Sequence, residues 1–234
     1  MNPESKAFLK TLVETPSPSG YEQRVQQLVR ERIRPWCDEV KTDVMGNVIG
    51  LRNPGGRPRV MLAGHCDQIG FIIRYITEDG FLYVDKIGGV DPVVATSHRV
   101  VIMAKRGAVP GVVGRKAIHL MDDEDRKRVP KLEDLYIDIG ATSKRDAEKM
   151  VALGDAGVFV QPYTELAHDR VVSMAFDNKM GTWVVTETLR LLHGKKFDAA
   201  IIGVSTVQEE IGSRGAQTSA FASEAEVGIA IDVG

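Results

Sequence analysis

The chain has 234 residues, 43% of them hydrophobic and 26% charged, which is the balance of a globular protein with a sizeable core. This composition excludes the disordered and fibrous classes of protein. The 30 basic and 32 acidic residues give a formal net charge of -2, so the chain has no general electrostatic attraction to nucleic acid or anionic membranes. The apolar runs are too short to cross a bilayer, and 2 cysteines are too few for a disulfide framework. We expect a cytoplasmic protein with reduced thiols.

The first 70 residues predict two helices followed by strands. Phe8 and Leu12 belong to a helically spaced apolar stripe that stops at a Pro- and Ser-rich turn. Ser19 and Glu22 fit a capping box for a second helix, which Pro35 ends. Strands follow, and the apolar run 59–63 predicts a buried strand that leads directly to a histidine.

The predicted secondary structure changes from α/β to β-rich in the middle of the chain and then returns to α/β. Between 71 and 164, short β-rich runs separated by glycine turns predict an inserted β domain, with one helix near 143–153 capped by Ser143. After 165 the α/β pattern resumes with a helix at 182–193 and two buried strands at 199–204 and 227–231. We therefore expect an α/β domain in two parts, 1–70 and 165–234, around the insert.

Side chains that bind metals follow four predicted strands of the α/β parts. In open α/β sheets, sites gather at the carboxyl ends of strands, so segments distant in sequence converge there. Imidazole nitrogen and carboxylate oxygen are ligands of zinc and similar divalent ions. We predict a two-metal hydrolase site whose ligands are His65, Asp177, Glu210 and Asp232.

Roles can be assigned from the chemistry of each side chain. A carboxylate bridges two ions by giving one oxygen to each, and Asp177 is the bridging candidate. Glu209 is adjacent to a ligand but free to act as the base that activates water. Asp67, two residues after His65, is expected to accept the other imidazole N–H and so fix the tautomer.

Each of these segments has an ordinary reading as well. Taken singly, a histidine after a strand or a Glu-Glu pair is more often a surface feature, and only their combination favours a site. For Cys66 we expect packing, with thiolate ligation as the alternative. The other histidines are assigned surface or structural roles; they are His98, His119, His168 and His193.

The motifs that carry these residues resemble those of a known family, the dinuclear zinc aminopeptidases that include glutamyl, deblocking and tetrahedral aminopeptidases and some proteins labelled cellulase M-like. The resemblance covers nearly the whole chain. It rests on the segments 63–71, 177–181, 207–216 and 230–233.

That resemblance implies an α/β catalytic domain with the mixed sheet of zinc peptidases and an inserted small β-barrel-like domain. It implies two divalent ions, with zinc first and cobalt or manganese as alternatives. One ion would be held by His65, Asp177 and Asp232, and the other by Asp177, Glu210 and a later histidine. Glu209 corresponds to the general base and Asp67 to the residue that orients the histidine.

Two departures from the family accompany the resemblance. Position 68 is Gln where relatives often carry Glu. Relatives also continue well beyond the position of Gly234 and supply the second metal's histidine there, so we expect the C-terminal remainder of the catalytic domain to be missing from this sequence.

The function implied is a metallo-aminopeptidase that removes N-terminal residues from peptides and self-associates through its insert, as a dimer-based dodecamer. No nucleic-acid or membrane partner is expected. Two alternatives stay open: another dimetal amide hydrolase, such as a deacylase or carboxypeptidase-like enzyme, and an inactive truncated scaffold. Glycoside hydrolysis is disfavoured because it needs a separate pair of acids.

Overall fold

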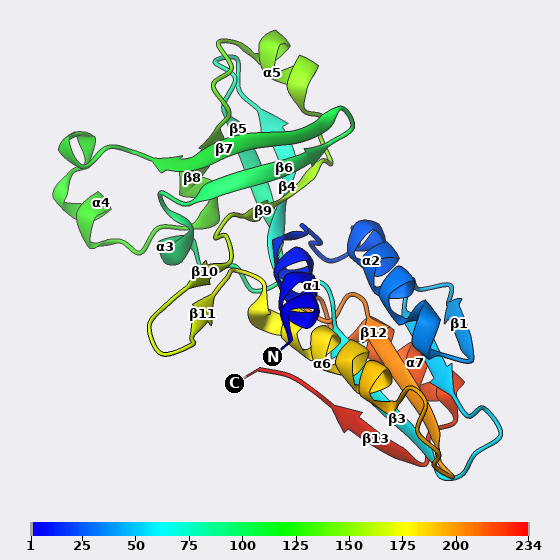
Figure 1. Ribbon diagram of the computed structural model, residues 1–234. Coiled ribbons are helices and arrows are strands. Elements are labelled where there is room, and N and C mark those ends of the chain that lie inside the picture. Colours follow the sequence, from blue (N-terminus) through cyan, green and yellow to red (C-terminus); the bar gives the residue numbers. More distant parts are fainter. Residues whose placement is uncertain (1, 234) are drawn as a thin grey trace. The chain divides into compact units, whose positions relative to one another are not determined.

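The computed structural model describes residues 2–233 and divides into two compact units. Unit 1 is formed by Met1–Gln68 with Pro162–Gly234, and unit 2 is the continuous segment Ile69–Gln161. Figure 1 shows the elements of both units, coloured along the sequence from blue at the N-terminus to red at the C-terminus. Among residues 2–233, no helix combines the length and the apolar character needed to span a membrane.

Unit 1 is built around a five-stranded sheet. Its helices are α1 (Pro3–Glu14), α2 (Gln23–Ile33), the 3-10 turn η1 (Arg34–Trp36), α6 (Phe176–Leu192) and α7 (Arg214–Ser223). Its main-sheet strands are β1 (Glu39–Thr42), β2 (Val48–Arg52), β3 (Arg59–His65), β12 (Ala200–Thr206) and β13 (Val227–Ala230). A separate two-stranded sheet pairs β10 (Thr164–Glu165) with β11 (Val171–Val172).

The main sheet has the strand order β1-β2-β12-β3-β13. Strands β12 and β13 both run parallel to β3, whereas β2 runs antiparallel to β12 and to β1. The sheet is therefore mixed, which confirms the predicted fold class. Since three strands are parallel, their carboxyl ends lie at one edge, and the segments after β3, β12 and β13 all start there.

Helices cover both faces of this sheet. Because side chains alternate along a strand, Val48 and Ile49 enter different cores. Val48 joins the buried residues of α1, α2 and α6, three helices that Figure 1 shows together. On the Ile49 side, Met61 accepts a hydrogen bond from Ser223 at the end of α7. The sheet thus has α1, α2 and α6 on one face and α7 on the other.

A close contact between backbones brings α6 to the end of β3. A Cβ placed on Gly64 would lie only 2.3 Å from the carbonyl carbon of Gly181, so no larger residue fits without movement of the backbone. Thr182 adds a hydrogen bond from its hydroxyl to the Gly64 carbonyl at 3.2 Å. This approach places the start of α6 beside the residue that follows Gly64.

Three sequence predictions were wrong in unit 1. Helix α2 begins at Gln23 with Glu22 as its N-cap residue, and the hydroxyl of Ser19 donates to Asp67 instead of forming a capping box. Asp177 does not follow a main-sheet strand but lies in a non-helical stretch at the start of α6. Strand β13 was expected to be buried, yet all four of its residues are exposed because it is the edge strand and pairs only with β3.

Unit 2 is a closed barrel with the strand order β4-β5-β8-β7-β6-β9. Closure removes free edges, and the interior is filled by apolar side chains such as Ile73, Leu82 and Ile102. Ser143 caps α5 as predicted, although this helix ends at Met150. The elements of the unit are β4 (Gly70–Ile76), β5 (Leu82–Ile87), α3 (Pro92–Ala95), β6 (Arg99–Ala104), β7 (Gly107–Arg115), η2 (Ile118–Leu120), α4 (Asp123–Lys127), η3 (Leu132–Asp134), β8 (Leu135–Asp138), α5 (Lys144–Met150) and β9 (Ala156–Phe159).

Candidate metal centre

His65 is the last residue of β3 and the centre of an acidic group of side chains. Its ring is almost fully buried, and Nε2 lies 3.3 Å from Oδ1 of Asp177. The same nitrogen is 3.8 Å from Oε2 of Glu209 and 4.0 Å from Oδ1 of Asp232. Three segments that are remote in sequence therefore place carboxylates around one imidazole nitrogen.

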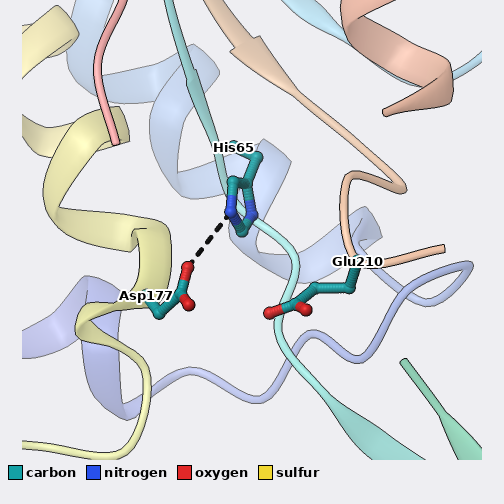
Figure 2. A group of neighbouring side chains, drawn as sticks. All are labelled: His65, Asp177 and Glu210. Atoms are coloured by element: carbon teal, nitrogen blue, oxygen red, sulfur yellow. Dashed lines mark ion pairs between the residues drawn. The ribbon is translucent and has the colours of Figure 1, made fainter. Parts of the chain in front are cut away.

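Glu210 completes a group with the geometry of a metal site. His65, Asp177 and Glu210 each offer one ligand atom, and these atoms all lie within 4.8 Å of one another. Figure 2 shows the imidazole and the two carboxylates turned toward a common space. Asp232 lies outside this triad but faces the same imidazole nitrogen. The four predicted ligands are thus together at one edge of the sheet.

Asp67 is fully buried beneath His65 and connects it to the next loop. The ring Nδ1 lies 3.0 Å from the backbone carbonyl of Asp67 and 3.3 Å from its carboxylate oxygen Oδ1, so both groups face the imidazole N–H. The carboxylate also accepts hydrogen bonds from Ser19 Oγ at 2.6 Å and from the backbone N–H groups of Glu209 and Glu210 at 3.0 and 3.2 Å. One buried residue therefore helps to position both the imidazole of His65 and the backbone of Glu209 and Glu210.

The loop after β12 is held by a residue that the sequence did not single out. Asn47 is fully buried in the turn between β1 and β2. Its Oδ1 accepts from Val207 N at 3.0 Å, and its Nδ2 donates to the carbonyl of Gly215 at 3.0 Å. The loop that bears Glu209 and Glu210 is thereby fixed at both ends.

Asn178 has the same role for the segment after β13. Its Nδ2 donates to the carbonyl of Ile231 at 2.8 Å, and its Oδ1 accepts from Gly181 N at 3.0 Å. Ile231 also donates from its backbone to Ala63 at 2.9 Å, which continues the β13–β3 pairing. The residue after Asp177 therefore positions the residue before Asp232.

Lys179 lies below the site and is fully buried. Its Nζ donates to the carbonyl of Thr15 at 2.5 Å and to Oε1 of Gln68 at 2.6 Å. Burial lowers the pKa of this amine to about 7. Gln68, which stands where the sequence comparison expected Glu, accepts this hydrogen bond from the lysine through its amide oxygen.

The charges of the group are strongly coupled. Burial of the Glu210 carboxyl, with the nearby charge of Asp177, raises its pKa to about 7. Burial also raises the pKa of Asp177, with further contributions from the charges of Asp232 and Glu209. For His65, burial lowers the pKa, but the hydrogen bond and charge of Asp67 and the charges of Glu209 and Asp232 outweigh it and raise the pKa to about 9.

This donor set fits a divalent cation. Within residues 2–233, no lysine or arginine forms an ion pair with the four carboxylates that surround His65 Nε2, which are Asp177, Glu209, Glu210 and Asp232. Crowded carboxylates without cationic partners are costly unless protons or metal ions compensate them. Imidazole and carboxylates in this arrangement are the ligands that zinc and similar ions take.

The other candidate ligands lie elsewhere. Cys66 is fully buried in the apolar core with Leu12 and Val48, in agreement with the packing role expected from the sequence. His98 belongs to unit 2, where its ring packs edge-on against Phe159 at 6.1 Å between centroids.

Comparison with known proteins identifies the family to which the chain belongs. The family model of the M42 glutamyl aminopeptidases matches residues 46–234. The chain belongs to this M42 family. The M42 chain is 36% identical over 229 residues to a lysyl aminopeptidase of Pyrococcus furiosus, a match that covers 97% of the chain and 65% of that enzyme.

Solved structures of M42-like proteins agree with this assignment. The TET aminopeptidase of the marine sediment archaeon Thaumarchaeota archaeon SCGC AB-539-E09 superposes with a TM-score of 0.95 at 35% identity, over 98% of this chain and 66% of that one. The TET1 peptidase of Pyrococcus horikoshii, which can assemble into a tetrahedron or a large octahedral shell, superposes with a TM-score of 0.88 at 31% identity, over 97% and 68%. The chain spans less than two thirds of the length of the curated relative above.

Proposed function

We propose that the protein is a metal-dependent aminopeptidase that removes N-terminal residues from peptides. The observation that carries this proposal is the group formed by His65, Asp177 and Glu210, whose ligand atoms lie within 4.8 Å of one another at the edge of the sheet. Membership of the M42 family supports it, as does the name of the P. furiosus relative, a lysyl aminopeptidase.

The proposed site holds two divalent ions, with zinc as the first choice and cobalt or manganese as alternatives. His65, Asp177 and Asp232 would hold one ion, and Asp177 and Glu210 would help to hold the other. When bound, the ions would polarise the scissile carbonyl and acidify the attacking water.

Glu209 is the proposed general base. Its Oε2 faces the imidazole of His65 at 3.8 Å, and its side chain is 35% exposed, so the carboxylate is partly open to solvent. The carboxylate takes a proton from the attacking water and returns it to the nitrogen of the departing amine. Asp67 orients His65, since its carbonyl and carboxylate both face the ring Nδ1.

We also propose that the β-rich insert, expected at 71–164, acts as a dimerisation domain and that dimers assemble further into a dodecamer. The assembly of the P. horikoshii relative supports self-association. Light scattering on the purified protein measures the assembly directly, and a monomer at micromolar concentration would contradict this part of the proposal.

The test of the activity uses the protein expressed from its complete gene. After loading with zinc, cobalt or manganese, it should release p-nitroaniline from aminoacyl anilides, whereas N-acetylated anilides should stay intact because they lack a free amine. Glu209→Gln should reduce kcat by roughly a thousandfold or more while the bound metal, measured by mass spectrometry, is unchanged. Cleavage of acetylated substrates at equal rates would favour a different amide hydrolase, and full activity of the variant would exclude Glu209 as the base.

A further inference from the structure

Ser213 occupies an unusual place at the start of α7. It is the N-cap residue of this helix, yet its backbone has φ 52° and ψ 32°, a left-handed conformation that favours glycine. A serine N-cap normally accepts a hydrogen bond from the first turn of its helix. Among residues 2–233, the hydroxyl of Ser213 makes no such bond and instead donates to Oε1 of Glu209 at 2.8 Å.

The backbone of Glu209 is fixed by the same turn. Its carbonyl accepts from the backbone N–H groups of both Gly212 and Ser213, each at 2.8 Å. Its own N–H donates to Asp67 Oδ1 at 3.0 Å. The main chain of Glu209 is therefore held from both sides, and its side chain is the part that retains freedom.

The hydroxyl of Ser213 restricts that remaining freedom. With Oε1 engaged by the hydroxyl, the other oxygen, Oε2, faces the imidazole of His65. A carboxylate held by one oxygen presents the second in a fixed direction, whereas a free one rotates among several rotamers. The left-handed backbone of Ser213 is the conformation in which its hydroxyl makes this contact.

We propose that Ser213 is a positioning residue for Glu209, which it holds with Oε2 directed at the reacting water. This inference rests on the proposed function, because it takes Glu209 to be the base. Glycine at position 213 would fit the backbone with less strain but would leave the carboxylate free. Activity and stability are therefore expected to change in opposite directions when this position is varied.

Two variants of Ser213 separate positioning from a structural role. Ser213→Gly removes the hydroxyl and relieves the left-handed strain, so Tm should rise while kcat falls by roughly tenfold with KM unchanged. Ser213→Thr retains a hydroxyl but places a β-branched residue at positive φ, so Tm should fall while kcat stays within about threefold of wild type. If Ser213 were merely structural, kcat would follow Tm in both variants.

Glu224 offers a matched control at the other end of α7. It is exposed and also left-handed, with φ 50°, at the C-cap of the helix. Glu224→Gly relieves the same kind of strain, so Tm should rise while kcat is unchanged. An equal loss of kcat in this control, or a Ser213→Gly variant as active as wild type, would overturn the proposal.

A crystal structure gives a readout that does not depend on turnover. In the wild-type protein, Glu209 Oε1 should lie within hydrogen-bonding distance of Ser213 Oγ, and in Ser213→Gly the carboxylate should adopt more than one orientation. A single unchanged orientation in the variant would overturn the inference even if the protein is an active aminopeptidase. If the wild type shows no metal-dependent turnover, the proposed function fails, and the two crystal structures still decide whether Ser213 positions this carboxylate.

Discussion

The interiors of the two units differ in kind. All the buried polar and charged side chains found among residues 2–233 lie in unit 1, and none of them falls within Ile69–Gln161. They include the fully buried Asp67, Asn47 and Lys179. The barrel of unit 2 is instead closed around apolar side chains such as Leu82, Ile102 and Ile137.

This difference shows what each unit must stabilise. Burial of apolar surface is enough to hold a closed barrel together, since its strands satisfy their own backbone groups. Unit 1 has to keep carboxylates close to one another, and buried polar groups are tolerated only where they find partners. Part of its polar interior therefore positions the proposed ligands. Changes at the buried residues that contact the ligand-bearing segments should affect metal binding, whereas changes in the barrel interior should affect stability alone.

The strongest test of this contrast removes the buried carboxylate below His65. Asp67→Ala leaves Ser19 and the two N–H groups of the Glu-Glu pair without their acceptor, and leaves His65 Nδ1 with the backbone carbonyl of residue 67 alone. We therefore expect the free energy of unfolding to fall by about 3–5 kcal/mol. Zinc affinity should fall by roughly 10–100-fold as well. Chemical denaturation and calorimetric titration measure the two effects, and an unchanged zinc affinity would contradict the link between this network and the site.

The matching change in unit 2 is a truncation in the barrel core. Ile102 is fully buried, and Ile102→Ala should lower the free energy of unfolding by about 2–4 kcal/mol through the cavity that it leaves. Zinc affinity in buffer should stay the same, because no ligand of the proposed site lies in this unit. A parallel loss of zinc affinity would show that the two interiors are not independent.

A smaller effect is expected at Asn178. Asn178→Ala removes the bonds to Ile231 and Gly181, so the free energy of unfolding should fall by about 1–2 kcal/mol and zinc should bind less tightly as Asp232 loses its position.

Gln26 is the matched control for Asn178. It is also a buried amide of unit 1, and it donates to the carbonyls of Gly46 and Ser205. Gln26→Ala should cost about the same stability with no change in zinc affinity. If both variants bind zinc as wild type does, Asn178 has only a structural role.

The sequence predicted the strands better than it predicted their surroundings. The apolar runs at 59–63 and 199–204 form β3 and β12 because both strands lie in the interior of the sheet. The equally apolar run at 227–231 forms β13, but Val227 is 45% exposed and Ile229 is 46% exposed. Strand position in a sheet is decided by tertiary pairing, which no local pattern records.

The site residues show the same division. His65, Glu210 and Asp232 could be predicted from their type and from the strands before them. Asp177 was predicted from its type, but the strand expected before it is not part of the main sheet. The structure still brings all four side chains together.

The partners of the site residues could not be predicted, because each contact spans a long stretch of chain: Ser19 and Asn47 look like a helix cap and a turn residue, yet they bind Asp67 and Val207. Local rules even assigned Ser19 to the wrong partner.

Zinc binding tests the central claim most directly, namely that unit 1 assembles a divalent-cation site around His65. Calorimetric titration should show saturable zinc binding to the wild-type protein, and His65→Gln should weaken it by about 100-fold or abolish it. His98→Gln, which changes a histidine of unit 2, should leave the titration unchanged. Zinc binding of equal strength in wild type and His65→Gln, or no saturable binding to the wild type, would contradict the claim.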